Sequence, residues 1–395
     1  MAPTLRCSLS LLAVFGLAAC TSGGGEDPAP VATEKLSASA ALGEKIFDDT
    51  SLSASGRVAC ATCHESDHAF AGDAVVPNGG SGVDVQGFRN APSLKYLTQN
   101  PAFFFDDEGT PTGGFDRDGR AASLAEQARR PFLAAHEMAN ASVADVVDKL
   151  SRATYAAEFR AAFGGGIFAT PDVAFERAAF ALQKYQQEDV AEFAPYTSKY
   201  DAFLAGQAQL TDAELRGLAL FNDPRKSNCA ACHPSARGAD GAPPLFTDFT
   251  YDNLGVPRNA DIRANADAAY FDLGLCGPDR TDLVEMRELC GAFKVPTLRN
   301  VALTAPYFHN GRFATLTEVV RFYVRRDTNP DEWYPLDPAT GLPRKFDDLP
   351  ADLTANVNVT EPPYDRQRGD PPALSEPEIQ DVVAFLQTLT DGFTQ

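Results

Sequence analysis

The sequence predicts a mainly α-helical protein with long loops, arranged as two related helical domains in tandem. Apolar residues recur at helical spacing along the chain, whereas strand signals are few and short. Proline and glycine interrupt four long stretches, residues 77–92, 110–119, 238–257 and 329–372, which we therefore expect to be loops. Long ordered loops are often functional, so they are of interest as places for a site.

A weak internal repeat supports the tandem arrangement. Residues 42–48 (LGEKIFD) and 217–223 (GLALFND) both carry Gly-x-x-x-Phe near the end of a helical pattern. In each copy a polar loop and then Cys-x-x-Cys-His follow, and the second helix has a capping-box start at 211–214. The repeat predicts two related domains, which we place at residues 36–205 and 206–395.

Each domain is expected to end in an amphipathic helix. In the first, Thr170 and Pro171 open a run that reaches Tyr185, with proline at the first helical position. In the second, a capping box at 375–378 precedes apolar residues at helical spacing. Those apolar residues are Ile379, Val382, Val383, Leu386 and Leu389.

The N-terminus has the pattern of a targeting segment. Arg6 gives a short charged region, and residues 9–19 form an apolar stretch that is too short to span a bilayer. The sequence before Cys20 resembles a bacterial lipoprotein cleavage site, which predicts a signal peptide at 1–19 and lipidation of Cys20. The Gly/Pro/Ser-rich residues 20–35 would be a flexible tether. The alternative is an ordinary secretory signal cut nearby, and either cleavage predicts an exported, periplasmic chain.

Composition and charge exclude some classes of partner. The 395 residues are 44% apolar, as expected of a globular protein with a real core. The formal net charge of −20 argues against nucleic acid, which selects basic surfaces. It fits a basic protein partner, and it equally fits an acidic surface that only keeps the protein soluble.

Two Cys-x-x-Cys-His motifs, residues 60–64 and 229–233, carry the chemistry. This is the attachment pattern of a c-type haem: Cys60, Cys63, Cys229 and Cys232 would form thioethers with the haem vinyl groups. His64 and His233 would bind the irons. A zinc site would need a second Cys/His pair at short spacing, and a thioredoxin-like dithiol would need a βαβ setting. Neither is visible, so we expect two covalent haems.

The remaining cysteines fit an oxidising compartment. Cys7 would leave with the signal peptide. Cys276 and Cys290 lie in a polar, glycine-containing stretch, and the simplest interpretation is one disulfide that closes a loop. By the chain-entropy argument, a loop of about 15 residues would be stabilised by roughly 3 kcal/mol.

Further motifs carry a resemblance to a known family. They are FRNAP (88–92), DGRA (118–121), LAEQA (124–128), Glu137-Met138, KVPTLRNV (294–301) and LTAPYFHNG (303–311). Together with the two haem motifs they resemble the bacterial di-haem cytochrome c peroxidase/MauG family, from about Ala41 to the C-terminus. The resemblance implies two cytochrome c-like haem domains in tandem, with the peroxide-reacting haem in the first and the electron-transfer haem in the second.

The resemblance also implies the distal ligand of the second haem. Methionine is the usual distal ligand in electron-transfer cytochromes, but the chain has only Met1, Met138 and Met286. Where family peroxidases place that methionine stands Tyr323, as in the MauG branch, whose second haem is ligated by tyrosine. An anionic phenolate should lower the reduction potential. The alternative is a core tyrosine, with His309 as the ligand.

The distal side of the first haem is expected to hold the catalytic group. The family pattern of Gln, then Pro four residues on, then Glu six residues on, is matched by Gln127, Pro131 and Glu137. Glu137 would move a proton between the peroxide oxygens, Gln127 would orient the oxidant, and Pro131 would crowd the sixth position of the iron. The alternative is a surface glutamate beside His136.

Two departures from the family pattern bear on mechanism. The loop at 79–88, where many family peroxidases hold a histidine that blocks the first iron, has none; His68 and His136 are weak substitutes. We therefore expect a five-coordinate first haem. The tryptophan that usually precedes Asp-Gly-Arg is replaced by Arg117, and the only tryptophan is Trp333, so strong coupling of the two haems by that route is in doubt.

A calcium ion between the haems is a further implication of the resemblance. Asn90 and the backbone carbonyls of Thr304 and Pro306 match the family's ligands, and oxygen donors suit a hard cation. The alternative is that these residues only build loop structure.

These features predict an exported di-haem c-type peroxidase that reduces hydrogen peroxide at the first haem. Its electrons would come from a small periplasmic cytochrome c or a cupredoxin. One alternative is a MauG-like oxidase that uses peroxide to modify a residue of a partner protein. Another is a di-haem electron-transfer protein without catalysis, which Glu137 and Gln127 argue against.

Overall fold

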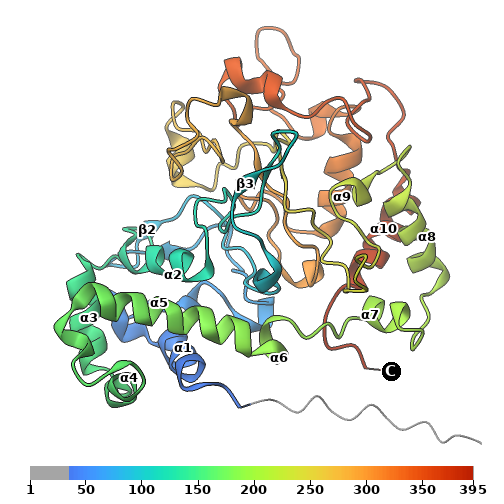
Figure 1. Cartoon of the computed structure of the whole chain (residues 1–395). Coiled ribbons are helices and arrows are strands. Elements are labelled where there is room, and N and C mark those ends of the chain that lie inside the picture. Colours follow the sequence, from blue (N-terminus) through green and yellow to red (C-terminus); the bar gives the residue numbers. More distant parts are fainter. Residues whose placement is uncertain (1–34, 395) are drawn as a thin grey trace, which may run out of the picture. The chain divides into compact units, whose positions relative to one another are not determined.

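The computed structural model describes residues 35–394, of which residues 36–394 belong to one compact unit (Figure 1). The predicted signal peptide at 1–19, the lipidation site Cys20 and nearly all of the predicted tether lie outside the described residues. No helix among those residues combines the length and the apolar character that crossing a membrane requires.

Helices dominate the regular structure. The described residues contain ten α-helices: α1 Ala38–Asp48, α2 Leu124–Leu133, α3 Val143–Arg152, α4 Ala156–Phe163, α5 Pro171–Glu188, α6 Val190–Phe193, α7 Lys199–Leu204, α8 Asp212–Asn222, α9 Leu316–Arg325 and α10 Glu376–Gln387. The six strands, each of two residues, are β1 Asn78–Gly79, β2 Val85–Gln86, β3 Phe104–Phe105, β4 Pro111–Thr112, β5 Tyr251–Asp252 and β6 Phe293–Lys294. They pair as three antiparallel two-stranded sheets, β1–β2, β3–β4 and β5–β6. The predicted class, mainly α with long loops, is confirmed.

The internal repeat is one packing arrangement used twice. Helix α1 packs on α5, and α8 packs on α10. The repeated glycine is the crossing point in both pairs: a Cβ on Gly43 would lie 2.0 Å from the Ala181 carbonyl oxygen, and one on Gly217 would lie 1.9 Å from that of Asp381. The repeated phenylalanines are buried beside these crossings. Close approach of the two helix backbones therefore explains why Gly-x-x-x-Phe occurs twice.

Local sequence sets the beginnings of these helices. Thr211 and Glu214 form the expected capping box of α8, in which each side chain binds the backbone N–H of the other. At the start of α10 the Glu378 carboxylate accepts hydrogen bonds from the backbone and hydroxyl of Ser375. Pro171 opens α5, where its missing N–H has no helical partner to lose.

Two main apolar clusters follow the two halves of the chain. The first is built around Phe132, Phe175 and Leu182, and the second around Phe221 and Phe385. Helix α7 packs with the second cluster, because the ring of Tyr200 contacts Phe246 and Phe385. The second core thus includes residues on the N-terminal side of the expected boundary at 205/206, which itself stays a prediction.

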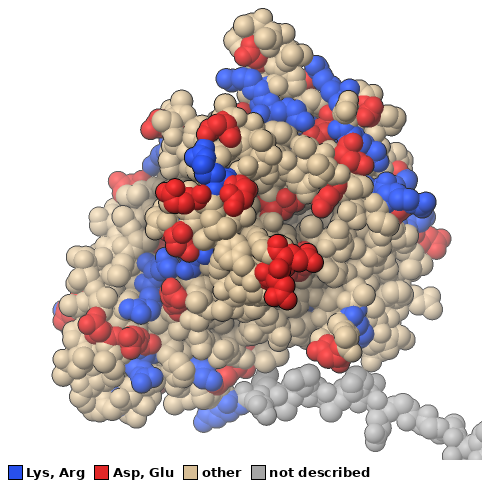
Figure 2. All heavy atoms as spheres, turned by 45° about the horizontal axis from the view of Figure 1, so that its top comes forward, with Lys and Arg blue, Asp and Glu red and all other residues tan. Residues whose placement is uncertain are grey.

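Charged side chains are mixed on the face drawn in Figure 2. Acidic and basic groups alternate there, and acidic groups gather near the middle of the view. A continuous basic surface of the kind that nucleic acid selects is not seen on this face.

Candidate functional site

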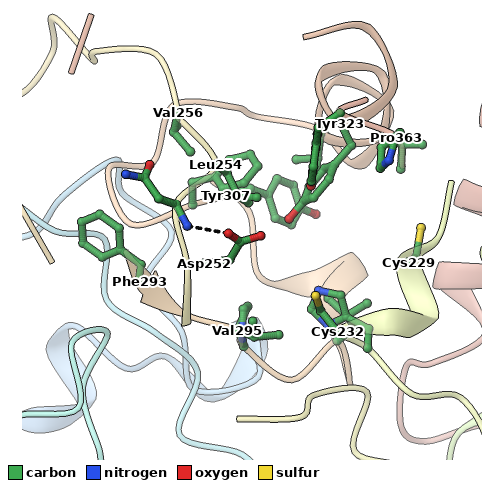
Figure 3. Close-up of a pocket in the computed structure, with 18 of the residues that line it drawn as sticks. Cys229, Cys232, Asp252, Leu254, Val256, Phe293, Val295, Tyr307, Tyr323 and Pro363 are labelled. Atoms are coloured by element: carbon green, nitrogen blue, oxygen red, sulfur yellow. Dashed lines mark hydrogen bonds between the residues drawn. The ribbon is translucent and has the colours of Figure 1, made fainter. Parts of the chain in front are cut away.

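Each Cys-x-x-Cys-His motif lies in the wall of its own cavity. Cys60, Cys63 and His64 line the first cavity. Cys229, Cys232 and His233 line the second (Figure 3). In both motifs the histidine N–H donates to the carbonyl of the first cysteine at 2.9 Å, so one helical turn presents both thiols and the imidazole together.

The two histidines are held in the same way. Nδ1 of His64 lies 3.0 Å from the Phe70 carbonyl oxygen, and Nδ1 of His233 lies 2.7 Å from that of Phe246. Phe70 and Phe246 both have positive φ, 56° and 53°, so each loop turns sharply at the residue that supplies the acceptor. A hydrogen bond at Nδ1 fixes the ring and assigns metal binding to Nε2.

The donor set fits covalent haem better than the alternatives. The four cysteines are not in disulfides. Burial raises the pKa of Cys60 and Cys232 to about 12 and that of Cys63 and Cys229 to about 11, whereas a reactive dithiol would have a lowered pKa. Within residues 35–394 no three His, Cys, Asp or Glu side chains are grouped to hold a metal ion, as a zinc site would require. Two protonated thiols and an oriented imidazole suit a c-type haem.

Cys276 and Cys290 form a disulfide, with their Cα atoms 5.0 Å apart. Both sulfur atoms are buried against Leu353. The bridge closes a loop between the second Cys-x-x-Cys-His motif and β6, and Asp279 of this loop lines the first cavity.

Tyr323 projects from α9 into the second cavity. In Figure 3 it lies on the side of the cavity opposite Cys229 and Cys232, near Tyr307. Its ring stacks on Phe308 at 5.8 Å between centroids and lies 6.1 Å from Tyr364. Burial raises the pKa of the Tyr323 hydroxyl, so without a cation nearby this group is protonated.

His309, the alternative ligand, lines the same cavity in a different setting. Its ring stacks on Phe293 with 3.7 Å between centroids and 6° between planes. Nε2 lies 3.9 Å from the Asp348 carboxylate. Burial lowers the pKa of His309 to about 3, so the imidazole is neutral. The stacking restricts rotation of the His309 ring, whereas the Tyr323 hydroxyl forms no hydrogen bond with residues 35–394.

Sequence reasoning missed Tyr364 as a candidate in this cavity. It is buried, lines the second cavity and contacts Tyr323. It stands in the proline-rich stretch 329–372, where no motif or helical spacing marks it. The hydroxyl of the third tyrosine, Tyr307, donates to the Val301 carbonyl at 2.9 Å and is thereby engaged.

The residues expected on the distal side of the first haem line the first cavity together. Gln127 and Pro131 lie one turn apart on α2, and Glu137 follows in the turn after this helix. The Glu137 side chain is 33% exposed. Burial raises the pKa of Glu137 to about 7, with further increases from Asp116 and Asp279 and an opposing effect of Arg120. A carboxyl group in this state can both accept and donate a proton near neutral pH.

Asp116 is a second carboxylate in this cavity, and sequence reasoning missed it. Its Oδ1 accepts a hydrogen bond from Gln127 at 3.3 Å, and its other oxygen lies 3.4 Å from Arg120. Burial raises the pKa of Asp116. Its place two residues before Asp-Gly-Arg is the only sequence signal, since the motif itself gives no reason to choose it.

The loop at 79–88 packs closely against the backbone of Glu137. The Gly80 N–H donates to the Glu137 carbonyl at 2.8 Å, and a Cβ on Gly79 would lie 2.5 Å from that oxygen. His136 lines the cavity and packs on Phe88, and burial lowers its pKa. His68 does not line the cavity; it lies 3.3 Å from the Glu65 carboxylate at an exposed position.

Arg117 lies between the first and the second cavity. It lines both of them and also the third cavity, which contains Asn90, Thr304 and Pro306. Burial and neighbouring Arg89 lower the pKa of Arg117 to about 10, so it stays cationic at neutral pH. That position 117 lies between two haems stays a prediction, and Trp333 packs elsewhere, on Phe313 and Phe322.

Two of the resemblance motifs meet in one buried ion-pair network. Arg89 of FRNAP pairs with Asp118 of DGRA at 2.6 Å and with Asp272 at 2.6 Å. Arg120 pairs with the same Asp118 carboxylate at 3.0 Å. Asp118 is fully buried, so it positions the loop that carries Asp116 and Arg117, while its partners Arg89 and Arg120 line the first cavity.

Comparison with known proteins finds relatives over most of the chain. A family model described as di-haem cytochrome c peroxidase matches residues 37–209. The methylamine utilization protein MauG of Paracoccus denitrificans is 36% identical over 361 residues, 89% of this chain and 88% of that protein. Cytochrome c551 peroxidase of Nitrosomonas europaea is 30% identical over 333 residues, 82% of this chain and 86% of that protein. The crystal structure of the diheme peroxidase BthA from Burkholderia thailandensis matches with a TM-score of 0.82 and 38% identity, over 93% of this chain and 89% of that one.

Proposed function

Because this chain belongs to the family of di-haem cytochrome c peroxidases and MauG proteins, we propose that it reduces hydrogen peroxide in the first cavity with electrons that pass through the second. Membership makes the chain an oxidoreductase that acts on peroxide and has two c-type haems. The observation that carries the finer proposal is Glu137, which lines the first cavity with a pKa of about 7.

The residues that would hold the cofactors follow from the two motifs. Cys60 and Cys63 would bind one haem through thioethers with His64 on the iron, and residues 229–233 would bind the other in the same way. When bound, each haem supplies a redox-active iron. The backbone acceptors at Phe70 and Phe246 keep both imidazoles turned for this role.

Glu137 would act as the general acid–base group. Two electrons and two protons convert hydrogen peroxide into two water molecules, and cleavage of the O–O bond requires a proton on the oxygen that leaves. The Glu137 carboxylate can accept a proton from one oxygen of hydrogen peroxide. The resulting carboxylic acid can then donate this proton to the other oxygen, which leaves as water. Its pKa of about 7 makes both forms available at neutral pH.

Gln127, Asp116 and Pro131 would prepare this step. The hydrogen bond from the Gln127 amide to Asp116 sets the direction of the amide, which can then orient peroxide. Asp116 also raises the pKa of Glu137, because two carboxylates in one cavity resist ionisation together. Pro131 occupies the wall with a ring that has no N–H and cannot ligate metal.

The second cavity would serve electron transfer, with Tyr323 as the distal ligand of its iron. Two observations support this assignment: Tyr323 lies across the cavity from the cysteines, and within the described part of the chain its hydroxyl has no hydrogen-bond partner. The electron donor would be a small cytochrome c or a cupredoxin in the periplasm. The N-terminal sequence supports export and attachment to the membrane through lipid on Cys20.

A peroxide assay with and without a reduced small cytochrome c tests the function. We expect two molecules of reduced cytochrome to be oxidised per peroxide, in parallel with peroxide loss, and Glu137→Gln to slow both. If the cytochrome is oxidised without peroxide, the protein would be an electron-transfer protein without peroxidase activity. Peroxide loss without oxidation of the donor would overturn the proposed electron route.

A MauG-like oxidase that modifies a partner protein is the second candidate. The absence of histidine from residues 79–88 and the tyrosine at 323 favour it, because both are features expected of that branch. Arg117 argues against it, since a guanidinium cannot be oxidised reversibly as an indole can. Mass spectrometry of candidate partners after treatment with enzyme and peroxide would detect an oxidised tryptophan or tyrosine if this activity exists.

A further inference from the structure

Arg117 is a half-buried cation that lines three cavities and pairs with no carboxylate in the described part of the chain. None of the ion pairs formed by residues 35–394 includes it, although Asp116 and Asp118 are its neighbours in sequence. Burying a cation is costly unless other groups solvate it. The hydrogen-bond partners of the Arg117 guanidinium therefore indicate which cation this site binds.

Both oxygen atoms of Asn90 solvate the guanidinium. Nε of Arg117 donates to the backbone carbonyl of Asn90 at 2.9 Å, and Nη2 donates to its side-chain Oδ1 at 2.7 Å. Asn90 is itself fixed: its Nδ2 donates to the Ala74 carbonyl at 3.1 Å, and its backbone N–H donates to the His309 carbonyl at 2.7 Å. The asparagine is 3% exposed, so Oδ1 cannot turn to another partner without breaking these bonds.

The family's calcium ion would need the same oxygen. Asn90 Oδ1 is the one side-chain ligand in the expected set, with the carbonyls of Thr304 and Pro306, and Arg117 lines the cavity that all three residues share. Calcium takes six to eight oxygen ligands and is repelled by a cation at contact distance. The residues present therefore do not fit calcium while the guanidinium is in place.

We propose that the guanidinium of Arg117 takes the place of calcium between the two haem-binding cavities, so that this protein carries its inter-haem cation as a side chain. One substitution, arginine where the family has tryptophan, would then have two consequences: the inter-haem aromatic ring is lost, and the calcium requirement is lost with it. The proposal concerns cation binding and does not depend on which substrate the enzyme oxidises.

Calcium binding to the haem-loaded full-length protein tests this inference. Wild-type protein and variants would be dialysed against EGTA and then against calcium, and measured for metal content and thermal unfolding. For the wild type we expect no retained calcium and the same midpoint in both buffers. Arg117→Met removes the charge and frees Asn90, so this variant should bind about one calcium ion per chain. Calcium at about 100 times its Kd should raise the midpoint of that variant by roughly 5 °C.

Matched variants make the result specific. Adding Asn90→Ala to Arg117→Met should abolish the calcium response, and Arg117→Lys, which keeps a cation, should remain indifferent to calcium. Arg225→Met removes a side chain that is 89% exposed and should behave as the wild type. One tightly held calcium ion in the wild type would overturn the proposal, as would an Arg117→Met protein that folds but binds none. If Arg117→Met fails to fold in both buffers, Arg117→Gln and the metal content of the wild type decide the question.

Discussion

The two cavities proposed to bind haem share one half of their construction and differ in the other. In both, one helical turn presents two thiols and an imidazole, and a carbonyl from a residue with positive φ fixes Nδ1. The opposite walls differ: Glu137, Gln127 and Asp116 face the first cavity, whereas tyrosines from α9 and from the loop after it face the second. The carboxyl groups of the first cavity can transfer protons, whereas a tyrosine of the second cavity can supply an anionic ligand.

In the proposed scheme, the residues for cofactor attachment and those for reactivity lie in separate segments of the chain. The shared half comes from a short local motif and one packing contact, Gly43 on α5 or Gly217 on α10. The differing half comes from segments far along the chain, so it could diverge without disturbing the attachment. The proposed division into a reacting and an electron-transfer cavity can therefore be tested one wall at a time.

Removing the thioether cysteines should have the largest effect. The wild type should have two haems per chain by pyridine haemochrome, and they should resist extraction by acidified acetone. Cys60→Ser with Cys63→Ser should leave one covalent haem, as should the matching pair at Cys229 and Cys232, because each cavity attaches its own. Replacing Cys276, which lies in the disulfide, should leave two. Extractable haem in the wild type would contradict the attachment scheme.

Glu137→Gln should act on the first cavity alone. The amide keeps the shape but cannot carry a proton, and general acid–base groups contribute about 10²–10⁴-fold. Rapid mixing with peroxide should show the absorbance change of the haem at least about a hundredfold more slowly, with both haems retained. His136→Asn, a change at the neighbouring cavity residue, should have much less effect. A variant as fast as the wild type would remove Glu137 from the mechanism.

Tyr323→Phe should act on the second cavity alone. Loss of an anionic ligand should raise the reduction potential of the second haem by on the order of 100 mV, a fraction of the roughly 0.8 V that axial ligands span. Spectroelectrochemical titration measures this shift while the first haem serves as an internal reference. Tyr364→Phe is the matched control in the same cavity. If His309→Gln shifts the potential and Tyr323→Phe does not, the imidazole is the ligand.

The repeated helix crossing should be equally sensitive in both halves. Gly43→Ala and Gly217→Ala would each place a Cβ about 2 Å from a backbone carbonyl oxygen, which forces the helices apart. Overpacking of this kind costs about 1–3 kcal/mol, and the better helix propensity of alanine offsets part of it. Chemical denaturation should show similar losses for both. Gly165→Ala, where a Cβ meets no atom within 4 Å, should be close to neutral. If only one of the two variants loses stability, the two helix crossings do not contribute equally to the free energy of unfolding.

The pH dependence of the peroxide reaction should reflect the ionisation of Glu137 in the first cavity. This is the smallest of the expected effects. The folded-state pKa of Glu137, about 7, is raised above that of an ordinary carboxyl group. The base form needed to accept the first proton is therefore lost as pH falls through about 7, and the peroxide reaction should slow about tenfold per unit below that value. The Glu137→Gln variant should show no such inflection. A wild-type inflection near 4 to 5 would place the carboxyl in a more solvated setting than the structure does.

Local patterns determined much of this protein. Capping boxes and apolar spacing predicted α8 and α10, because helix ends and helix faces are set by residues within a few positions of each other. The same holds for the thiols and imidazole of each Cys-x-x-Cys-His turn. Gln127 and Pro131 were predicted from the family pattern, and their four-residue spacing on α2 explains why both line the first cavity. The mainly α class followed from these local signals.

Contacts between distant segments decided the rest. The acceptor for His64 is six residues further along the chain, whereas that for His233 is thirteen, so no common spacing marked them. Asp116 and Tyr364 line the cavities although no sequence motif marks them. They lie in long loops, whose positions depend on how the loops pack against the apolar cores. The sequence showed that arginine stands at position 117; only the tertiary structure brought its guanidinium to both oxygens of Asn90. The reason is physical: burial and pairing of a charge depend on which segments meet in space, and that is settled by the packing of the whole chain.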